Sequence, residues 1–199
     1  SDPEKDPLLK AVDKCVEAGL VVVSAAGNSG PMERTILSPG ISNKVITVGA
    51  VDDKRTTDIS DDTIAEFSSR GPTLQGLQKP DLVAPGVNIK SLSHSKLDSY
   101  TSLSGTSMAT PLISGSLALM FNKYGDLSPN EFKRKLTDAC IPLNDSASSQ
   151  GAGMLNLRNL FSTESNDNSK SEIGTFGTSD TLETIIMFLI IIFLLDSRI

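Results

Sequence analysis

The fold class is decided by the apolar stretch Leu20-Val21-Val22-Val23-Ser24-Ala25-Ala26. Its run of β-branched residues fits a parallel strand that is buried on both faces. A helix precedes it, because Asp6 can cap a helix, Pro7 suits the first helical position, and apolar residues recur about every 3.6 positions up to Gly19. A helix followed by a buried strand predicts an α/β protein with a mostly parallel sheet.

Two more strands are expected in a segment that is otherwise rich in loops. Both candidates, residues 45–48 and residues around 87–89, are rich in β-branched residues. The connections between them contain many Gly, Pro and Ser residues, so we expect most of residues 27–105 to be loop.

Two more helices are expected towards the C-terminus. Residues 107–124 are mostly apolar and predict a buried helix, which tolerates Pro111 if that residue falls in the first turn. Ser128, followed by Pro129 and Glu131, has the pattern of a capping box and predicts the next helix.

Composition and charge narrow the class of protein. The 199 residues are 38% hydrophobic, which suits one domain with a tail. A net charge of −6 and a pI near 4.8 argue against nucleic acid as a partner, because phosphate binding needs clustered Lys and Arg.

The cysteines and the N-terminus bear on the compartment. Cys15 and Cys140 lie far apart in helical patterns, so we expect free thiols rather than a disulfide. Residues 1–6 lack the pattern of a signal peptide, and we expect the chain to begin within a longer protein. These features are compatible with a cytoplasmic or a secreted protein.

The last part of the chain changes in composition. Residues 161–181 are polar and Ser-rich, and we expect a disordered linker. Residues 182–199 form a hydrophobic tail whose apolar run, 185–195, is shorter than the roughly 20 residues that span a bilayer. Three interpretations stay open: a non-native or truncated tail, membrane association through residues 182–195, or packing on the domain.

The most specific stretch for chemistry is Gly105-Thr106-Ser107-Met108-Ala109-Thr110-Pro111. A serine at the start of a buried helix has its hydroxyl on a rigid element, and the helix N-terminus offers partial positive charge where an oxyanion would form. The simpler alternative is that Ser107 only caps the helix. Over all seven residues, however, the stretch resembles the nucleophile motif of the subtilase family, the subtilisin-like serine proteases of peptidase family S8.

A second motif follows the first buried strand. The stretch Ala25-Ala26-Gly27-Asn28-Ser29-Gly30 is similar to the subtilase segment that supplies the oxyanion-hole asparagine. The resemblance implies that the Asn28 side chain donates to the oxyanion, and that Ala25, Ala26 and Gly27 wall the pocket for the substrate's first side chain. Without the resemblance, the stretch is an ordinary asparagine-containing turn.

Three more segments extend the resemblance, which covers about residues 7–160. Residues 67–72 and 79–86 resemble subtilase segments between the asparagine and the serine, and we expect structural roles for both. Residues 151–156 resemble the closing Gly-x-Gly segment of the family, and they lack the context of a phosphate-binding loop.

The chain also departs from the family pattern. Subtilases carry an aspartate in an Asp-Ser/Thr-Gly context and a histidine in a His-Gly-Thr-His context, and neither occurs here. The single histidine, His94, is expected in an exposed loop. With Asp98 and Ser107 it repeats the chymotrypsin chain order, but the separations are far too short. Leu112 replaces the histidine that many subtilases have after the motif's proline, a position outside the triad.

An α/β-hydrolase is also excluded. Those enzymes use Gly-x-Ser-x-Gly and place the histidine after the serine. Here Ala109 replaces the last glycine, and no histidine follows Ser107.

The resemblance therefore implies a three-layer α/β subtilisin-like fold with a mostly parallel sheet, whose N-terminal part we expect to be missing from residues 1–160. It implies a serine endopeptidase that cleaves proteins or peptides through an acyl-enzyme on Ser107. Calcium is common in the family, but we recognise no ligand set for it or for another metal. Because the triad aspartate and histidine are absent, we expect the chain alone to be inactive. The competing prediction is a truncated fragment without activity, or a module that binds peptides or the missing N-terminal part.

Overall fold

The computed structural model describes residues 5–93, 95 and 97–162. His94 lies outside the described residues, and so does most of the expected linker and the whole hydrophobic tail. Within the described part of the chain, no helix combines the length and the apolar character needed to cross a membrane.

A mixed sheet forms the centre of the molecule, and most of its strands are parallel. Four parallel strands lie in the order β1 (Val23–Ala25), β2 (Ile46–Asp52), β4 (Leu82–Pro85) and β8 (Met154–Leu155). Two short antiparallel strands complete it, β3 (Thr63–Ile64) beside β2 and β7 (Cys140–Ile141) beside β8. This arrangement confirms the predicted α/β class and its mostly parallel sheet.

The strand predictions need three corrections. The first strand is shorter than the apolar stretch that predicts it, because only residues 23–25 pair with β2. The sequence predicts a loop where the structure has β4. This strand is short, with Pro80 before it and Pro85 at its end, and both prolines favour a connection. The strand expected around residues 87–89 begins only at Ile89, because Asn88 takes a left-handed backbone conformation with φ of 53°.

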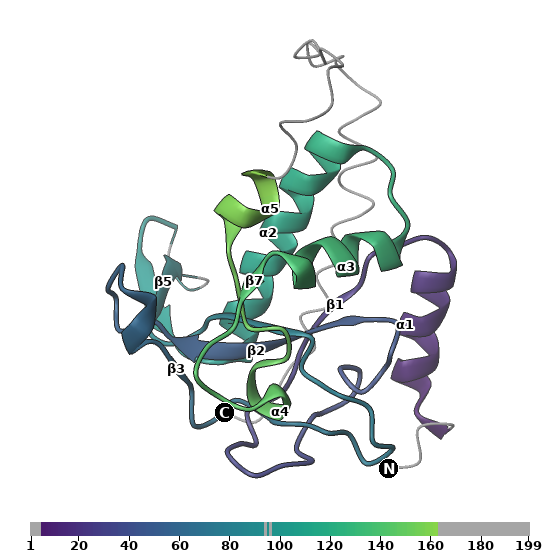
Figure 1. The fold of residues 1–199 in the computed structure, drawn as a ribbon, viewed down its shortest axis with the longest axis horizontal. Coiled ribbons are helices and arrows are strands. Elements are labelled where there is room, and N and C mark those ends of the chain that lie inside the picture. The colour runs from purple at the N-terminus through teal and green to yellow at the C-terminus, as the bar shows by residue number, and fades with distance from the viewer. Residues whose placement is uncertain (1–4, 94, 96, 163–199) are drawn as a thin grey trace.

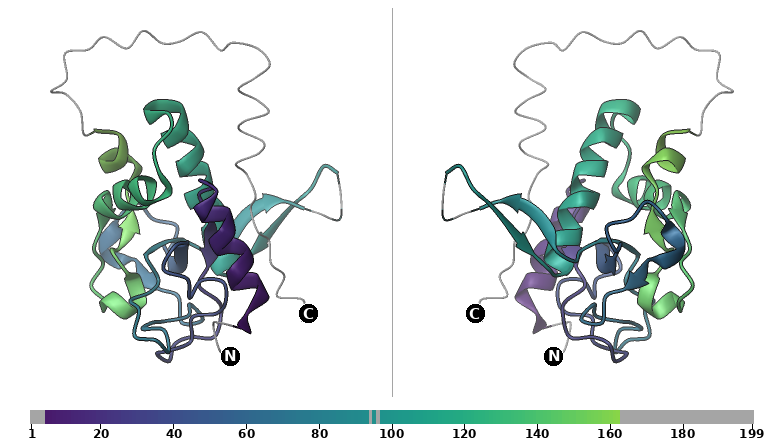
Figure 2. Two further views of the ribbon diagram at one scale, coloured as in Figure 1. Left: turned by 90° about the vertical axis from the view of Figure 1, so that its right-hand side faces the viewer. Right: turned by 90° about the vertical axis from the view of Figure 1, so that its left-hand side faces the viewer.

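That later strand is part of a separate hairpin. Strands β5 (Ile89–Leu92) and β6 (Tyr100–Leu103) pair only with each other among the described strands, in an antiparallel register that sets Leu92 opposite Tyr100. Figure 2 shows the hairpin standing out from the body in both views. It leads directly into the segment that contains Ser107.

The predicted helices are present with small changes at their ends. Helix α1 (Pro7–Glu17) is capped by Asp6, which accepts from two backbone N–H groups. Helix α3 (Pro129–Asp138) has the predicted capping box between Ser128 and Glu131. The remaining helical elements are α2 (Thr106–Tyr124), α4 (Ala147–Gln150), α5 (Leu157–Ser162) and the 3-10 turn η2 (Ile59–Asp61).

The place of Pro111 in α2 differs from the prediction. The helix begins at Thr106, so Pro111 is its sixth residue and lies in the second turn. A proline there has no N–H to donate to the carbonyl of Ser107, four residues earlier. The helix continues through Pro111 because its next turns pack on the sheet, where Ile113 and Leu117 are buried.

Alternate residues of the strands face two different layers. On one face, residues such as Ile46, Val48 and Leu82 pack against α2, α3 and α5. On the other face, Val22 and Val45 contact Val12 of α1. A second cluster consists of Val51, Ile64, Val83 and Leu143. Figure 1 shows α2, α3 and α5 together above β2, and α1 at the end of the sheet away from the hairpin. The sheet is thus covered by helices and loops, in three layers.

The packed body extends slightly beyond the predicted boundary. Phe161 and Ser162 belong to α5, although the sequence assigns both to the linker. The Phe161 ring stacks on Tyr124 of α2 with 6.4 Å between ring centroids, and the Tyr124 hydroxyl donates to the carbonyl of Leu160. These contacts bring the chain into the body as far as the last described residue.

Candidate active site

The structure brings Asn28 to the N-terminus of α2. The Oδ1 atom of Asn28 accepts from the backbone N–H of Thr106 at 2.9 Å and from the Thr106 hydroxyl at 3.0 Å. The same hydroxyl accepts from the backbone N–H of Gly27 at 3.2 Å. Two motifs that lie 78 residues apart in the sequence are thus joined by side-chain hydrogen bonds.

Asn28 also acts as the cap of α2. The N-cap position is Gly105, which has no side chain to cap the helix. The Oδ1 atom of Asn28 therefore accepts from the first helical N–H group. Because Ser107 is the second residue of α2 and not its N-cap, the structure removes the alternative in which Ser107 serves only as a cap.

This geometry leaves two hydrogen-bond donors unbonded at the N-terminal end of α2. The backbone N–H of Ser107 and the Nδ2 group of Asn28 bond to no other residue in the described part of the chain. Ser107 is half-buried, and Asn28 is exposed. Unbonded N–H donors at a helix N-terminus are groups of the kind that can stabilise an oxyanion.

The three expected pocket residues differ in exposure. Ala26 is fully buried, donates its N–H to Val48 and accepts from Leu37 through its carbonyl. It therefore has no accessible surface to offer a substrate. Ala25 and Gly27 are half-buried and lie on either side of it.

Two adjacent buried serines, which the sequence does not single out, lie near the site, and only Ser69 bonds to the loop that carries Asn28. Ser68 and Ser69 are fully buried in a loop that follows β3. The Ser68 hydroxyl accepts from the N–H of Ala50 at 3.0 Å, and the Ser69 hydroxyl accepts from the N–H of Ser29 at 3.1 Å. Their position inside a segment that resembles subtilases was the one available signal, because serine in a loop is otherwise common.

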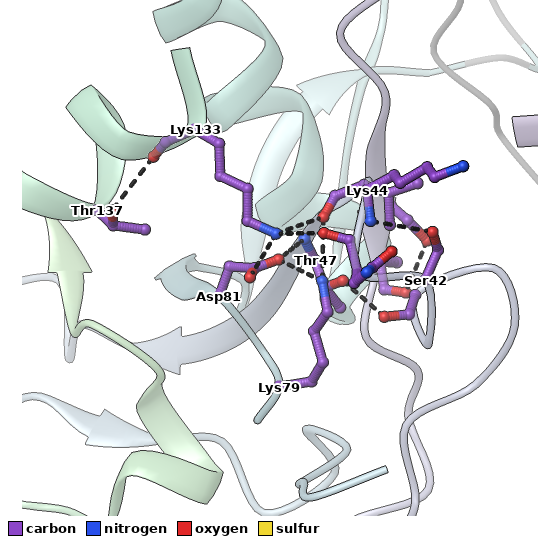
Figure 3. A network of polar contacts seen from close by, with 12 residues as sticks. Ser42, Lys44, Thr47, Lys79, Asp81, Lys133 and Thr137 are labelled. Atoms are coloured by element: carbon purple, nitrogen blue, oxygen red, sulfur yellow. Dashed lines mark hydrogen bonds and ion pairs between the residues drawn. The ribbon is translucent and has the colours of Figure 1, made fainter. Parts of the chain in front are cut away.

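A polar network joins the sheet to α3 through Asp81 and two lysines (Figure 3). Asp81 forms ion pairs with Lys79 at 2.6 Å and with Lys133 of α3 at 2.8 Å, and it also accepts from the N–H of Thr47 at 2.7 Å. Both lysines donate to the carbonyl of Val45 as well. Burial lowers the pKa of Lys79 to about 8, although the Asp81 charge opposes this shift. The network ties α3 to the sheet.

The other candidates for chemistry are not brought to this site. Asp98 is exposed in the loop between β5 and β6. Burial raises the pKa of the Cys140 thiol to about 12, so it is a poor nucleophile. Among residues 5–162 as far as they are described, no three His, Cys, Asp or Glu side chains gather in a way that could hold a metal ion.

A serine in the first turn of a helix, and an asparagine that follows a parallel strand and bonds to the same turn, are the features expected of a subtilisin-like serine hydrolase. A family model described as the subtilase family matches residues 1–169. The chain is 48% identical over 169 residues to serine protease AprX of Bacillus subtilis, an alignment that covers 78% of this chain and 38% of AprX. It is 40% identical to subtilisin DY of Bacillus licheniformis, covering 75% of this chain and 50% of that protein.

A solved structure agrees with these sequence matches. The fold is similar to that of the prenylagaramide maturation protease PagA, with a TM-score of 0.61 and 30% identity over 77% of this chain and 54% of that one. The chain belongs to the subtilase family. It spans half or less of the length of AprX and subtilisin DY.

Proposed function

We propose that this chain carries the nucleophile and the oxyanion hole of a serine endopeptidase that cleaves proteins or peptides. The observation that carries the proposal is the pair of hydrogen bonds from Thr106 to the Oδ1 atom of Asn28. They occupy the oxygen of the amide and hold the side chain at the start of the helix that contains Ser107, with its Nδ2 donors unbonded in the described part of the chain. Membership of the subtilase family and the names of the relatives support the same reaction class.

In the proposed reaction, the Ser107 Oγ atom attacks the carbonyl carbon of the scissile peptide bond and loses its proton to a histidine. The carbonyl oxygen becomes an oxyanion, which accepts from the Ser107 N–H and from Asn28 Nδ2. The same histidine protonates the leaving amine, and water then hydrolyses the acyl-enzyme. Ala25 and Gly27 would form part of the wall around the substrate's first side chain.

The histidine and its aspartate would come from outside these 199 residues. Neither family motif occurs in the sequence, and the one histidine, His94, stands in a different context. Without a general base, the hydroxyl of Ser107 is a weak nucleophile. We therefore propose that the chain alone is inactive and that activity needs an N-terminal part of the domain.

The surface of the described body supports this requirement. Helix α2 is mostly apolar and has no distinct polar face, a pattern typical of a helix that is largely buried. Leu112 and Leu119 of this helix are nevertheless 44% and 53% exposed. Strand β1 pairs with only one neighbour among the described strands. Both features would be covered by the additional helices and strands of a longer domain.

The test is a complementation assay. The full chain is incubated with a chromogenic peptide and with a serine-directed fluorophosphonate, first alone and then after co-refolding with an N-terminal subtilase fragment that carries the aspartate and histidine. We expect turnover and labelling only in the second case, and loss of both in Ser107→Ala. Robust turnover by the chain alone would contradict the missing-base proposal. Turnover that survives Ser107→Ala after complementation would contradict the assignment of the nucleophile.

A further inference from the structure

The loop that carries Asn28 is held by one buried serine. The backbone N–H of Ser69 donates to the carbonyl of Gly27 at 2.9 Å, and the Ser69 hydroxyl accepts from the backbone N–H of Ser29 at 3.1 Å. Both chain neighbours of Asn28 are therefore bound to Ser69. These bonds fix the backbone of Asn28 from both sides, while the Thr106 bonds fix its side chain.

The loop also packs tightly against the segment that contains Ser69. Gly30 donates its N–H to the carbonyl of Phe67 at 2.9 Å, and a Cβ atom at Gly30 would lie only 2.2 Å from the carbonyl oxygen of Ser68. Gly27 has a φ of 109°, and a Cβ atom there would lie 2.9 Å from the Ser69 hydroxyl. Only glycine at both positions allows this close approach, so little room is left for the loop to shift.

Such support matters because Asn28 itself is exposed. An exposed asparagine in a turn would otherwise sample several backbone and side-chain conformations, and each would move its Nδ2 donor. A donor stabilises a transition state well only if it is already oriented before the charge develops. The bonds from a fully buried serine provide that orientation without touching the substrate.

We propose that Ser69 is a positioning residue for the oxyanion hole, which holds the Asn28 loop in its productive conformation through its hydroxyl and its backbone N–H. The inference rests on the proposed function, because it assigns Ser69 a role in that reaction. Ser69 acts through Asn28, so its removal should lower kcat and leave KM nearly unchanged.

The adjacent serine provides a matched control. Ser68 is buried to the same extent, but its hydroxyl accepts from the N–H of Ala50 in β2 and not from the Asn28 loop. Ser68→Ala and Ser69→Ala each delete one buried hydroxyl from adjacent positions. The two variants therefore separate the loss of a buried hydrogen bond from the loss of support for Asn28.

The kinetic test uses the full chain co-refolded with the N-terminal subtilase fragment. We expect Ser69→Ala to lower kcat by about 10- to 100-fold with KM changed less than about 3-fold, and Ser68→Ala to change kcat less than about 3-fold. In an Asn28→Ala background, Ser69→Ala should have little further effect, because the donor that it orients is gone. Equal losses in the two serine variants, or fully additive losses with Asn28→Ala, would overturn the proposal.

A measurement on the unmodified chain keeps the inference testable if Ser69→Ala does not fold. Ser29 is exposed, yet its N–H donates to the buried Ser69 hydroxyl, so its hydrogen exchange should be slower than that of an unbonded amide. Exchange at the unprotected rate would overturn the inference. A protected Ser29 without any Ser107-dependent turnover after complementation would contradict the proposed function instead, and so the two failures are distinguishable.

Discussion

The Lys79–Asp81–Lys133 network allows a sharp prediction about stability. Lys79 is only 1% exposed, and its ammonium group donates to the Asp81 carboxylate and to the Val45 carbonyl. Asp81→Asn removes the negative charge that compensates both lysines and leaves a buried ammonium group without a counter-charge. Breaking a buried pair in this way costs about 3–5 kcal/mol of unfolding free energy.

Removing the other partner should cost much less. Lys79→Met deletes the same ion pair and replaces the lysine by an apolar side chain of similar length. Asp81 then keeps its bonds to Lys133 and to the N–H of Thr47, at 2.8 and 2.7 Å, so that no buried charge loses its last partner. We expect a loss below about 1.5 kcal/mol, because buried ion pairs are often replaced by apolar groups at little cost.

The assay is urea unfolding of the full chain and the two variants, followed by far-UV circular dichroism at pH 7. Both variants should keep the slope of the wild-type transition, so that the midpoints report stability alone. Equal losses in Asp81→Asn and Lys79→Met would refute the reasoning, because they would show that the contact itself matters and not the charge left behind.

The same lysine predicts a dependence on pH. Its pKa is about 8 in the folded chain and near the ordinary value of 10.5 when unfolded. Between these two values the unfolded chain binds more protons at this site, so the free energy of unfolding gains a contribution that rises with pH. The wild type should therefore gain stability relative to Lys79→Met from pH 8 to pH 10.5. A difference between the two proteins that stays flat over this range would contradict the lowered pKa.

Three other expectations concern the site, the thiol and the tail. Asn28→Ala should lower kcat of the complemented enzyme by about 10²–10³, the loss measured for the corresponding donor in subtilisin, with little change in KM; a loss confined to KM would reassign Asn28 to substrate binding. Cys140 should react with a thiol reagent at pH 8 only after unfolding, since burial raises its pKa to about 12. Fast labelling of Cys140 itself in the folded chain would contradict that raised pKa. Removing residues 163–199 should leave the fold intact but reduce self-association in sedimentation and binding in liposome flotation; unchanged association would exclude a role for the tail.

Elements with strong local signals could be predicted from the sequence. The cap of α1 and the capping box of α3 combine several residues within one turn, and both appear as predicted. Strand β4 was missed because its position depends on its neighbours. It lies between β2 and β8 and pairs with both strands. Pro80 before it and Pro85 at its end suggest a connection instead. Local pattern is a weaker guide for short strands than for helices.

The site shows the same division between local and distant information. Ser107 and Asn28 could be proposed because each lies in a short motif with a recognisable pattern. The role proposed for Ser69 could not, because its contacts with Gly27 and Ser29 join segments about 40 residues apart. A buried serine with one hydrogen bond leaves no periodicity or spacing in the sequence. Such supporting residues emerge only when the distances between segments are known.

Helix α2 exposes large apolar side chains in the described body. The sequence of this helix predicts a mostly apolar, buried helix, and residues such as Ile113 and Leu117 are buried as predicted. Leu112 and Leu119 are exposed in the described body. Exposing large side chains costs free energy, so a helix of this composition is stable only when another layer covers it. The matched part of this chain covers only 38% of AprX and 50% of subtilisin DY. We expect one additional layer of the domain to do two things. It would bring the general base to Ser107, and it would cover the exposed leucines of α2. Completing the fold and completing the active site would then be one event.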